Sequence, residues 1–244
     1  MKILLPTAKE MNLKAISNRP ADRSQETQKI VQELAQISAA DLAKHYKIKL
    51  EPAQKEAERW QALLKEEAVT YPAWNLFDGL MYRQMTRDKL TEAQERYLKE
   101  HVFITSALYG VINVFDAIAP HRLDFLMGFK VNDSSLKAFW RKHFDRAVQE
   151  DELIISLLSS EFETVFSRSI QDRMVRLKFV EETDGQHKTH STISKKGRGQ
   201  CLNALVKAEI QDIEALKELC FEGFEYCESL SSERDITFVK MMDE

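Results

Sequence analysis

The sequence predicts a single-domain α+β protein, in which a mixed α/β body has a mixed sheet flanked by helices. Apolar residues recur at helical spacing in several segments, and short apolar runs typical of buried strands lie between those segments. Only 7 glycines and 5 prolines occur in 244 residues. Glycine and proline are too sparse to form an evident linker between domains. We therefore expect residues 1–244 to form one compact domain.

The N-terminal part of the chain contains one predicted strand followed by helices. The strand is the short apolar run Ile3–Leu5. Helices are predicted over Ser24–Ile37, Ser38–Tyr46 and Pro52–Glu67. Ser24 and Ser38 are residues of the type that cap helix N-termini, and Pro52 suits a first helical turn.

Helices and strands alternate through the middle of the chain. Thr91–Gln94 has the pattern of a capping box, which predicts a helix that ends near His101. Val102–Thr105 and Leu153–Leu158 are apolar runs that predict buried strands. Between them, apolar residues at helical spacing predict a helix over Leu136–Val148.

The C-terminal part begins with a predicted β-hairpin. Inward and outward residues alternate from Met174, the turn is Asp184-Gly185, and the return strand is expected over His187–Ser194. The basic segment Lys195–Gly199 is then expected to be a loop before a helix over Gln200–Ile210. Glycines that let the backbone approach an anion, next to a helix N-terminus, indicate a phosphate-binding loop. A solvated basic turn is the alternative.

The charge of the chain is unevenly distributed. Its formal net charge is −4, which argues against a generic polyanion binder. The segment between residues 168 and 198, however, contains eight basic residues and only four acidic ones. No apolar run is long enough for a signal peptide or a membrane span, so we expect a cytoplasmic protein with no membrane partner.

Neither the cysteines nor the histidines predict a metal or a cofactor. Cys201, Cys220 and Cys227 contain no C-x-x-C pair and are expected to be reduced thiols. His187 and His190 lie beside the Asp-Gly turn and are expected to be solvated. We therefore predict no metal site and no cofactor.

Polar residues follow the predicted strands closely. They are Thr7–Lys9, Ser106–Gly110, Ser159–Glu161 and Lys195–Gly199. If the strands are parallel, their carboxyl ends lie at one edge of the sheet, where ligand sites gather. We therefore expect one cleft lined by Lys9, Ser106, Tyr109, Glu161 and Arg198, and a pKa of Glu161 lowered by its basic neighbours.

Several short motifs occur together in one order along the chain. They are Pro6–Lys9, Phe77–Tyr82, Ser106–Val111, Pro120–Asp124, Phe139–Trp140, Leu158–Phe162, Lys195–Gly199, and Gly223–Phe224 with Ser229 and Ser232. In order and approximate spacing they resemble the YaaA family of peroxide-stress resistance proteins. The resemblance implies a cytosolic role against hydrogen peroxide, binding to DNA, and limitation of iron-driven oxidative damage.

The resemblance also implies a basic cleft and a helix-hairpin-helix-like element at Ser106–Val111. The cleft positions would be Lys9, Tyr82, Ser106, Tyr109, Gly110, Arg122, Glu161, Lys195, Lys196 and Arg198. Ala107 replaces a glycine that is common in the family, which weakens the hairpin assignment because alanine resists positive φ. Tyr109, Trp140 and Phe224 also suit core packing.

Two functions follow, with a weaker third. The cleft binds the phosphate backbone of DNA without reading sequence, or it acts as an enzyme on a nucleotide or another phosphorylated small molecule. In the enzyme, Glu161 or Asp116 would be the acid or base, and Tyr109 is a further catalytic candidate. The third function is iron binding through Glu161, Asp116 and His121, which no ligand spacing supports.

Overall fold

The computed structural model describes residues 1–242, and its main feature is one eight-stranded sheet. The strand order is β11, β12, β9, β8, β1, β3 and β4, and β10 also pairs with β9. The strands are β1 (Lys2–Pro6), β3 (Val102–Ser106), β4 (Gly110–Asn113), β8 (Ile154–Ser156), β9 (Met174–Thr183), β10 (Gln186–Lys188), β11 (Phe224–Tyr226) and β12 (Asp235–Met241). The predicted mixed α/β fold with a mixed sheet is confirmed.

The centre of the sheet is parallel. β1 runs parallel to β3 and to β8, β8 to β9, and β9 to β12. β4, β10 and β11 each join antiparallel to a neighbour. Ile3, Leu4 and Leu5 of β1 are fully buried, as in strands covered on both faces. Because parallel strands end at the same edge, the segments that follow β1 and β8 meet there.

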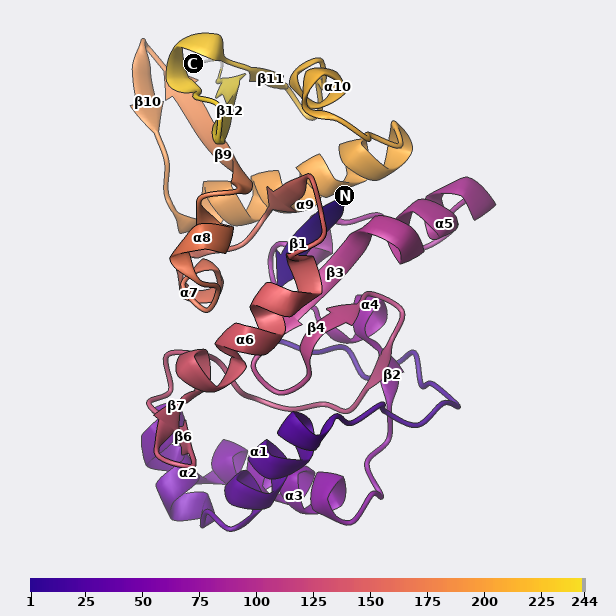
Figure 1. Cartoon of the computed structure of the whole chain (residues 1–244), viewed down its shortest axis with the longest axis vertical. Helices are drawn as coiled ribbons and strands as arrows, with labels where there is room; N and C mark the ends of the chain where they lie inside the picture. Colours follow the sequence, from indigo (N-terminus) through magenta and orange to yellow (C-terminus); the bar gives the residue numbers. More distant parts are fainter. Residues whose placement is uncertain (243–244) are drawn as a thin grey trace.

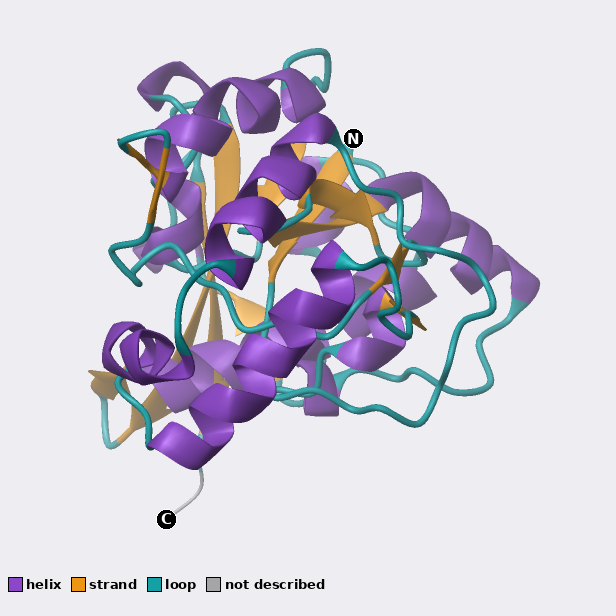
Figure 2. Cartoon of the chain, turned by 90° about the horizontal axis from the view of Figure 1, so that it is seen from below, coloured by secondary structure: helices purple, strands orange, loops and turns teal. Residues whose placement is uncertain are grey.

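Helices surround this sheet (Figure 2). The longer ones are α1 (Gln25–Ala35), α2 (Ala39–Tyr46), α3 (Leu50–Leu64), α5 (Glu92–His101), α6 (Leu136–Val148) and α9 (Ser191–Lys207). The short ones are α4 (Ala73–Leu76), α7 (Ser160–Glu163), α8 (Arg168–Gln171) and α10 (Ile213–Lys217), with 3₁₀ turns η1 (Tyr82–Gln84) and η2 (Glu228–Leu230). Figure 1 shows α1, α2 and α3 together at one end of the molecule, with β9 to β12 and α10 at the other.

Two small two-stranded sheets complete the fold. β2 (Tyr71–Pro72) pairs with β5 (Ala117–Ile118), and β6 (Lys130–Val131) pairs with β7 (Ser134–Ser135). Most of the helices and strands contribute side chains to one apolar core. Trp140 and Phe224 are buried in it, which confirms their predicted packing role.

Three of the predicted helix starts are confirmed by their caps. The Ser24 hydroxyl accepts a hydrogen bond from the Thr27 N–H, and Ser38 caps α2 in the same way. Thr91 and Gln94 form the predicted capping box at the start of α5. α3 begins at Leu50 rather than at Pro52. Helix boundaries follow the local cap chemistry where that chemistry is present.

The predicted loop at Lys195–Gly199 is wrong, because α9 already begins at Ser191. The Asp184-Gly185 turn is confirmed, with both residues at positive φ, but the return strand β10 ends at Lys188. The His190 side chain then accepts a hydrogen bond from the Thr192 N–H and caps α9. The basic residues of this segment therefore project from a helix.

The glycines of α9 allow close packing of the helix. A Cβ atom at Gly197 would overlap the ring of Phe179 in β9, and one at Gly199 would overlap the Met81 carbonyl. Alanine favours a helix more than glycine does, so these glycines weaken the local helical signal. They bring α9 against the sheet and against the segment before η1, instead of contacting a phosphate as predicted.

Ser106–Val111 is a β-hairpin and not the expected helix-hairpin-helix-like element. Ser106 at the end of β3 pairs with Gly110 at the start of β4, which has a φ of +80°. The Ser106 hydroxyl accepts the N–H groups of Leu108 and Tyr109 and closes the turn. The apolar residues on both sides of this turn favour strands, and they pair with each other.

Two further predictions concern the surroundings of the chain. Cys201, Cys220 and Cys227 are free thiols, as predicted. Within residues 1–242, none of the helices combines the length and apolar character needed to cross a membrane. The cytoplasmic location stays a prediction.

Candidate functional site

A cleft of about 380 Å³ opens beside the carboxyl ends of β1 and β8. It is lined by side chains from five parts of the chain. These are Pro6–Glu10, Phe77 with Gly79–Tyr82, His121–Asp124 with Met127, Ser159 with Glu161 and Phe162, and Lys195 with Arg198 of α9. Of the residues predicted to line one cleft, six do so: Lys9, Tyr82, Arg122, Glu161, Lys195 and Arg198.

Two arginines give the cleft its most unusual feature. Within residues 1–242, the Nε atoms of Arg122 and Arg198 are buried and have no hydrogen-bond partner. A buried donor left without a partner costs about 1–3 kcal/mol, and more when the group is charged. Burial lowers the pKa of Arg198, but a guanidinium stays protonated in proteins. Both arginines line the cleft, where a guanidinium can bind an anion.

The helices of the chain fix both arginines in place. The Arg122 guanidinium lies over the ring of Tyr46 at the end of α2, 5.7 Å from the ring centre. The close packing of Gly197 and Gly199 positions the α9 backbone that carries Arg198. Such prior positioning reduces the entropy that a bound ligand would have to remove.

The acidic side of the cleft is formed by Asp124 and Glu161. Lys9 Nζ lies 3.0 Å from Asp124 Oδ2, and Glu161 Oε1 accepts a hydrogen bond from the Phe125 N–H. Burial, followed by the nearby charge of Asp124, raises the pKa of Glu161. The predicted lowering of this pKa is wrong, because Lys9 is paired with Asp124 and the carboxyl group is half-buried. Glu161 is therefore better suited to donate a proton than a typical glutamate.

His121 is a buried, neutral residue in the cleft wall. Its side chain is 3% exposed, and burial lowers its pKa to about 4. Its ring packs against the rings of Tyr109, at 5.3 Å, and Phe77, at 6.4 Å, between ring centres. Nδ1 lies 2.8 Å from the Ala119 carbonyl oxygen. The sequence predicts His121 only as part of the iron-binding hypothesis and does not place it in the cleft.

Tyr82 lies in the cleft wall as predicted, but its hydroxyl is already engaged. It donates a hydrogen bond of 2.8 Å to the Pro6 carbonyl, and burial raises its pKa. Tyr82 therefore fixes the segment that follows β1. That segment carries Lys9 into the cleft.

Four of the predicted site residues lie outside the cleft lining. Ser106 is buried in the β-hairpin turn, and Gly110 packs against the Trp140 ring. The Tyr109 hydroxyl accepts a hydrogen bond from the Ala119 N–H, and burial raises the pKa of Tyr109 to about 12. Lys196 is exposed on α9 beside the cleft-lining Lys195. The first three of these side chains stabilise the fold.

Asp116 is the fifth predicted residue outside the lining. Its Oδ2 accepts a hydrogen bond of 2.8 Å from the Asn113 N–H and stabilises the turn after β4. The predicted iron-binding group of Glu161, Asp116 and His121 therefore does not come together. Elsewhere in the described chain, no three His, Cys, Asp or Glu residues are arranged to hold a metal.

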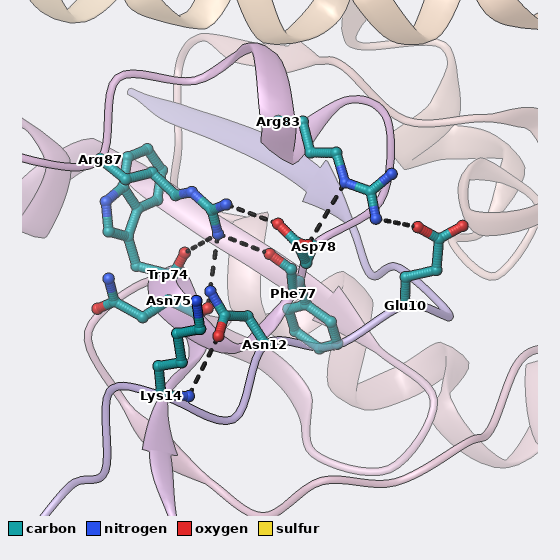
Figure 3. Close-up of polar contacts among 9 residues, drawn as sticks. All are labelled: Glu10, Asn12, Lys14, Trp74, Asn75, Phe77, Asp78, Arg83 and Arg87. Atoms are coloured by element: carbon teal, nitrogen blue, oxygen red, sulfur yellow. Dashed lines mark hydrogen bonds and ion pairs between the residues drawn. The ribbon is translucent and has the colours of Figure 1, made fainter.

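An ionic network supports the wall at Phe77–Tyr82 (Figure 3). Arg87 donates to Asp78 at 2.8 Å and to the Phe77 carbonyl at 2.9 Å, and Arg83 bridges Asp78 and Glu10. Burial alone would raise the pKa of Asp78, but Arg87 and Arg83 together lower it. The network ties the segment after β1 to the segment before η1.

Sequence reasoning missed the roles of Asp124 and Phe77. Both lie in motifs that resemble the family, Pro120–Asp124 and Phe77–Tyr82, yet neither was assigned to the site. Their position in those motifs was the available signal. Only the fold shows that Asp124 pairs with Lys9 and that Phe77 contacts His121.

A family model and individual relatives both match this chain over nearly its whole length. The family model described as "Peroxide stress protein YaaA" matches residues 1–230. A UPF0246 protein of Streptococcus gordonii is 49% identical over 243 residues, covering 100% of both chains. A UPF0246 protein of Streptococcus pneumoniae is 51% identical over 240 residues, covering 98% of this chain and 99% of the relative.

Proposed function

Since the chain belongs to the YaaA family of peroxide stress proteins, we propose that it serves the peroxide response by binding a phosphorylated small molecule in its cleft. The two buried, unpartnered Nε atoms of Arg122 and Arg198 carry this proposal. A phosphate offers several acceptor oxygens and a charge that matches the arginine fork.

The charges in the cleft favour a phosphate over a cation. Asp124 is already paired with Lys9, whereas Lys195, Arg122 and Arg198 line the cleft as further cationic groups that can attract an anion.

The size of the cleft favours a small molecule. A volume of about 380 Å³ lies in the range of small-molecule sites, about 300–1,000 Å³. Arg122 and Arg198 line the cleft and are only partly exposed, so a ligand has to enter the cleft to contact them. If the ligand is also chemically converted, Glu161 is the group placed to donate a proton.

DNA binding is the second candidate function. The observation that favours it is the exposure of Lys9, Lys195 and Lys196 at and beside the cleft. These side chains suit the phosphate backbone, which carries no sequence information. In this alternative, the protein limits iron-driven damage by covering DNA.

Calorimetric titration with inorganic phosphate and with ribose 5-phosphate tests the proposed function. We expect both to bind the parent chain, and Arg198→Gln to weaken the binding of ribose 5-phosphate about tenfold or more, because hydrogen bonds to charged groups contribute about 1.5–3 kcal/mol. The matched control is Lys196→Gln on the same helix, which should bind like the parent. Equal losses in both variants, or no binding by the parent, would refute the proposal.

A further inference from the structure

The hydrogen bonding of His121 defines which ring nitrogen is free. Nδ1 lies 2.8 Å from the Ala119 carbonyl oxygen, and a carbonyl only accepts hydrogen bonds. Nδ1 therefore carries the hydrogen. Because the ring is neutral, Nε2 has a lone pair and no hydrogen.

This lone pair is not used by the protein. Across residues 1–242, Nε2 of His121 has no hydrogen-bond partner, and the residue is buried and lines the cleft. Phe77 and Tyr109 hold the ring on two sides. His121 is thus a fixed acceptor in the cleft wall.

The polar atoms of the cleft need two different kinds of hydrogen-bond partner. The arginine Nε atoms require an acceptor, such as a phosphate oxygen, whereas His121 Nε2 requires a donor. A ligand that supplies both kinds of partner carries an anionic group and, apart from it, an N–H or O–H donor.

The apolar lining narrows the chemical class further. Apolar side chains contribute much of the cleft wall, among them Phe77, Met81, Leu123, Met127 and Phe162. A sugar phosphate alone would expose its hydroxyl groups to this apolar surface, which is unfavourable. A planar heterocycle buries its faces there and still presents an N–H group at its edge.

We propose that the ligand is a nucleoside monophosphate, whose phosphate binds at Arg122 and Arg198 and whose base donates an N–H hydrogen bond to Nε2 of His121. This inference rests on the proposed function, because it requires a phosphate in the same cleft. It adds the base as the second recognised group. His121 is then the residue that selects for a base.

Calorimetric titration of the full chain with ribose 5-phosphate and with adenosine, guanosine, cytidine and uridine monophosphates tests this inference. We expect at least one nucleotide to bind about tenfold or more tightly than ribose 5-phosphate, as one added hydrogen bond and a buried ring imply. His121→Phe keeps an aromatic ring but removes the acceptor. It should reduce that ratio several-fold.

A second measurement needs no variant. The best-binding nucleotide is compared with its analogue in which methyl groups replace the N–H hydrogens of the base, and we expect the analogue to bind about tenfold more weakly. If ribose 5-phosphate binds as tightly as every nucleotide, or the analogue as tightly as the nucleotide, the inference is wrong while the phosphate site stands. If nothing binds in an Arg198-dependent manner, the proposed function itself fails.

Discussion

Lys9 Nζ lies 3.0 Å from Asp124 Oδ2, and both side chains line the cleft. Lys9 follows β1, whereas Asp124 lies in the loop after β5, so the ion pair joins two walls of the site. Lys9 is 61% exposed and its partner 9%. The pair neutralises Lys9 and leaves the arginines as the stronger anion-binding groups.

Removing the charge of Asp124 should therefore change two properties of the cleft. In Asp124→Asn, Lys9 is freed and we expect ribose 5-phosphate to bind several-fold more tightly. The pKa of Glu161 should also fall, because the Asp124 charge contributes to its elevation. Calorimetry and an NMR titration of the carboxyl carbons measure the two effects. The exposed Asp172→Asn is the control, and unchanged values in Asp124→Asn would contradict the assignment.

The neutral state of His121 predicts a pH-dependent stability. Because the pKa is lowered from 6.5 to about 4, the folded chain binds fewer protons here than the unfolded chain. The contribution is complete above pH 6.5 and is lost as the pH falls towards about 4. Between neutral pH and pH 5, about 2 kcal/mol of the free energy of unfolding should disappear.

Urea unfolding at several pH values measures this loss. His121→Phe should be less sensitive to acid than the parent by that amount, while a change at the exposed His45, His45→Gln, should not alter the slope. A parent and a His121→Phe variant with the same acid dependence would show that His121 is protonated in the folded chain.

The α9 glycines predict an unusual response to alanine. Gly197→Ala and Gly199→Ala should each lower the free energy of unfolding by about 1–3 kcal/mol, because the added methyl group overlaps Phe179 or the Met81 carbonyl. Helix propensity alone predicts stabilisation of up to about 1 kcal/mol. Ser194→Ala in the same helix is the control for propensity. Chemical denaturation separates these outcomes, and a stabilised Gly197→Ala would refute the packing explanation.

The salt dependence of DNA binding separates the two candidate functions. If α9 contacts a duplex, Lys195→Ala and Lys196→Ala should each flatten the slope of log K against log salt by about 0.9. A small-molecule cleft predicts a shallow slope in the parent and no effect of Lys196→Ala. Fluorescence anisotropy with a labelled duplex measures the slopes.

The sequence predicted those site residues whose position depends only on the order and direction of the strands. Lys9 and Glu161 follow apolar runs, and runs that form adjacent parallel strands bring the following residues to one edge. The helix caps at Ser24 and Ser38 were also predictable, because cap chemistry is local.

Other features depend on partners that are distant in the sequence. Gly197 and Gly199 weaken the helical signal of α9. The reason for glycine at these positions is the close approach of Phe179 and Met81, which leaves no space for a Cβ atom. The unpartnered arginine atoms and the Lys9–Asp124 pair likewise exist only in the folded chain. Ser106 and Tyr109 were placed in the cleft because they follow a strand, but they instead stabilise a β-hairpin turn and the core.

A crystal of the chain soaked with ribose 5-phosphate shows directly which residues hold the phosphate. We expect a phosphate in the cleft with its oxygens within hydrogen-bond distance, about 2.7–3.2 Å, of the guanidinium groups of Arg122 and Arg198. A phosphate bound only at the exposed Lys195 and Lys196, with both Nε atoms still unpartnered, would contradict this expectation.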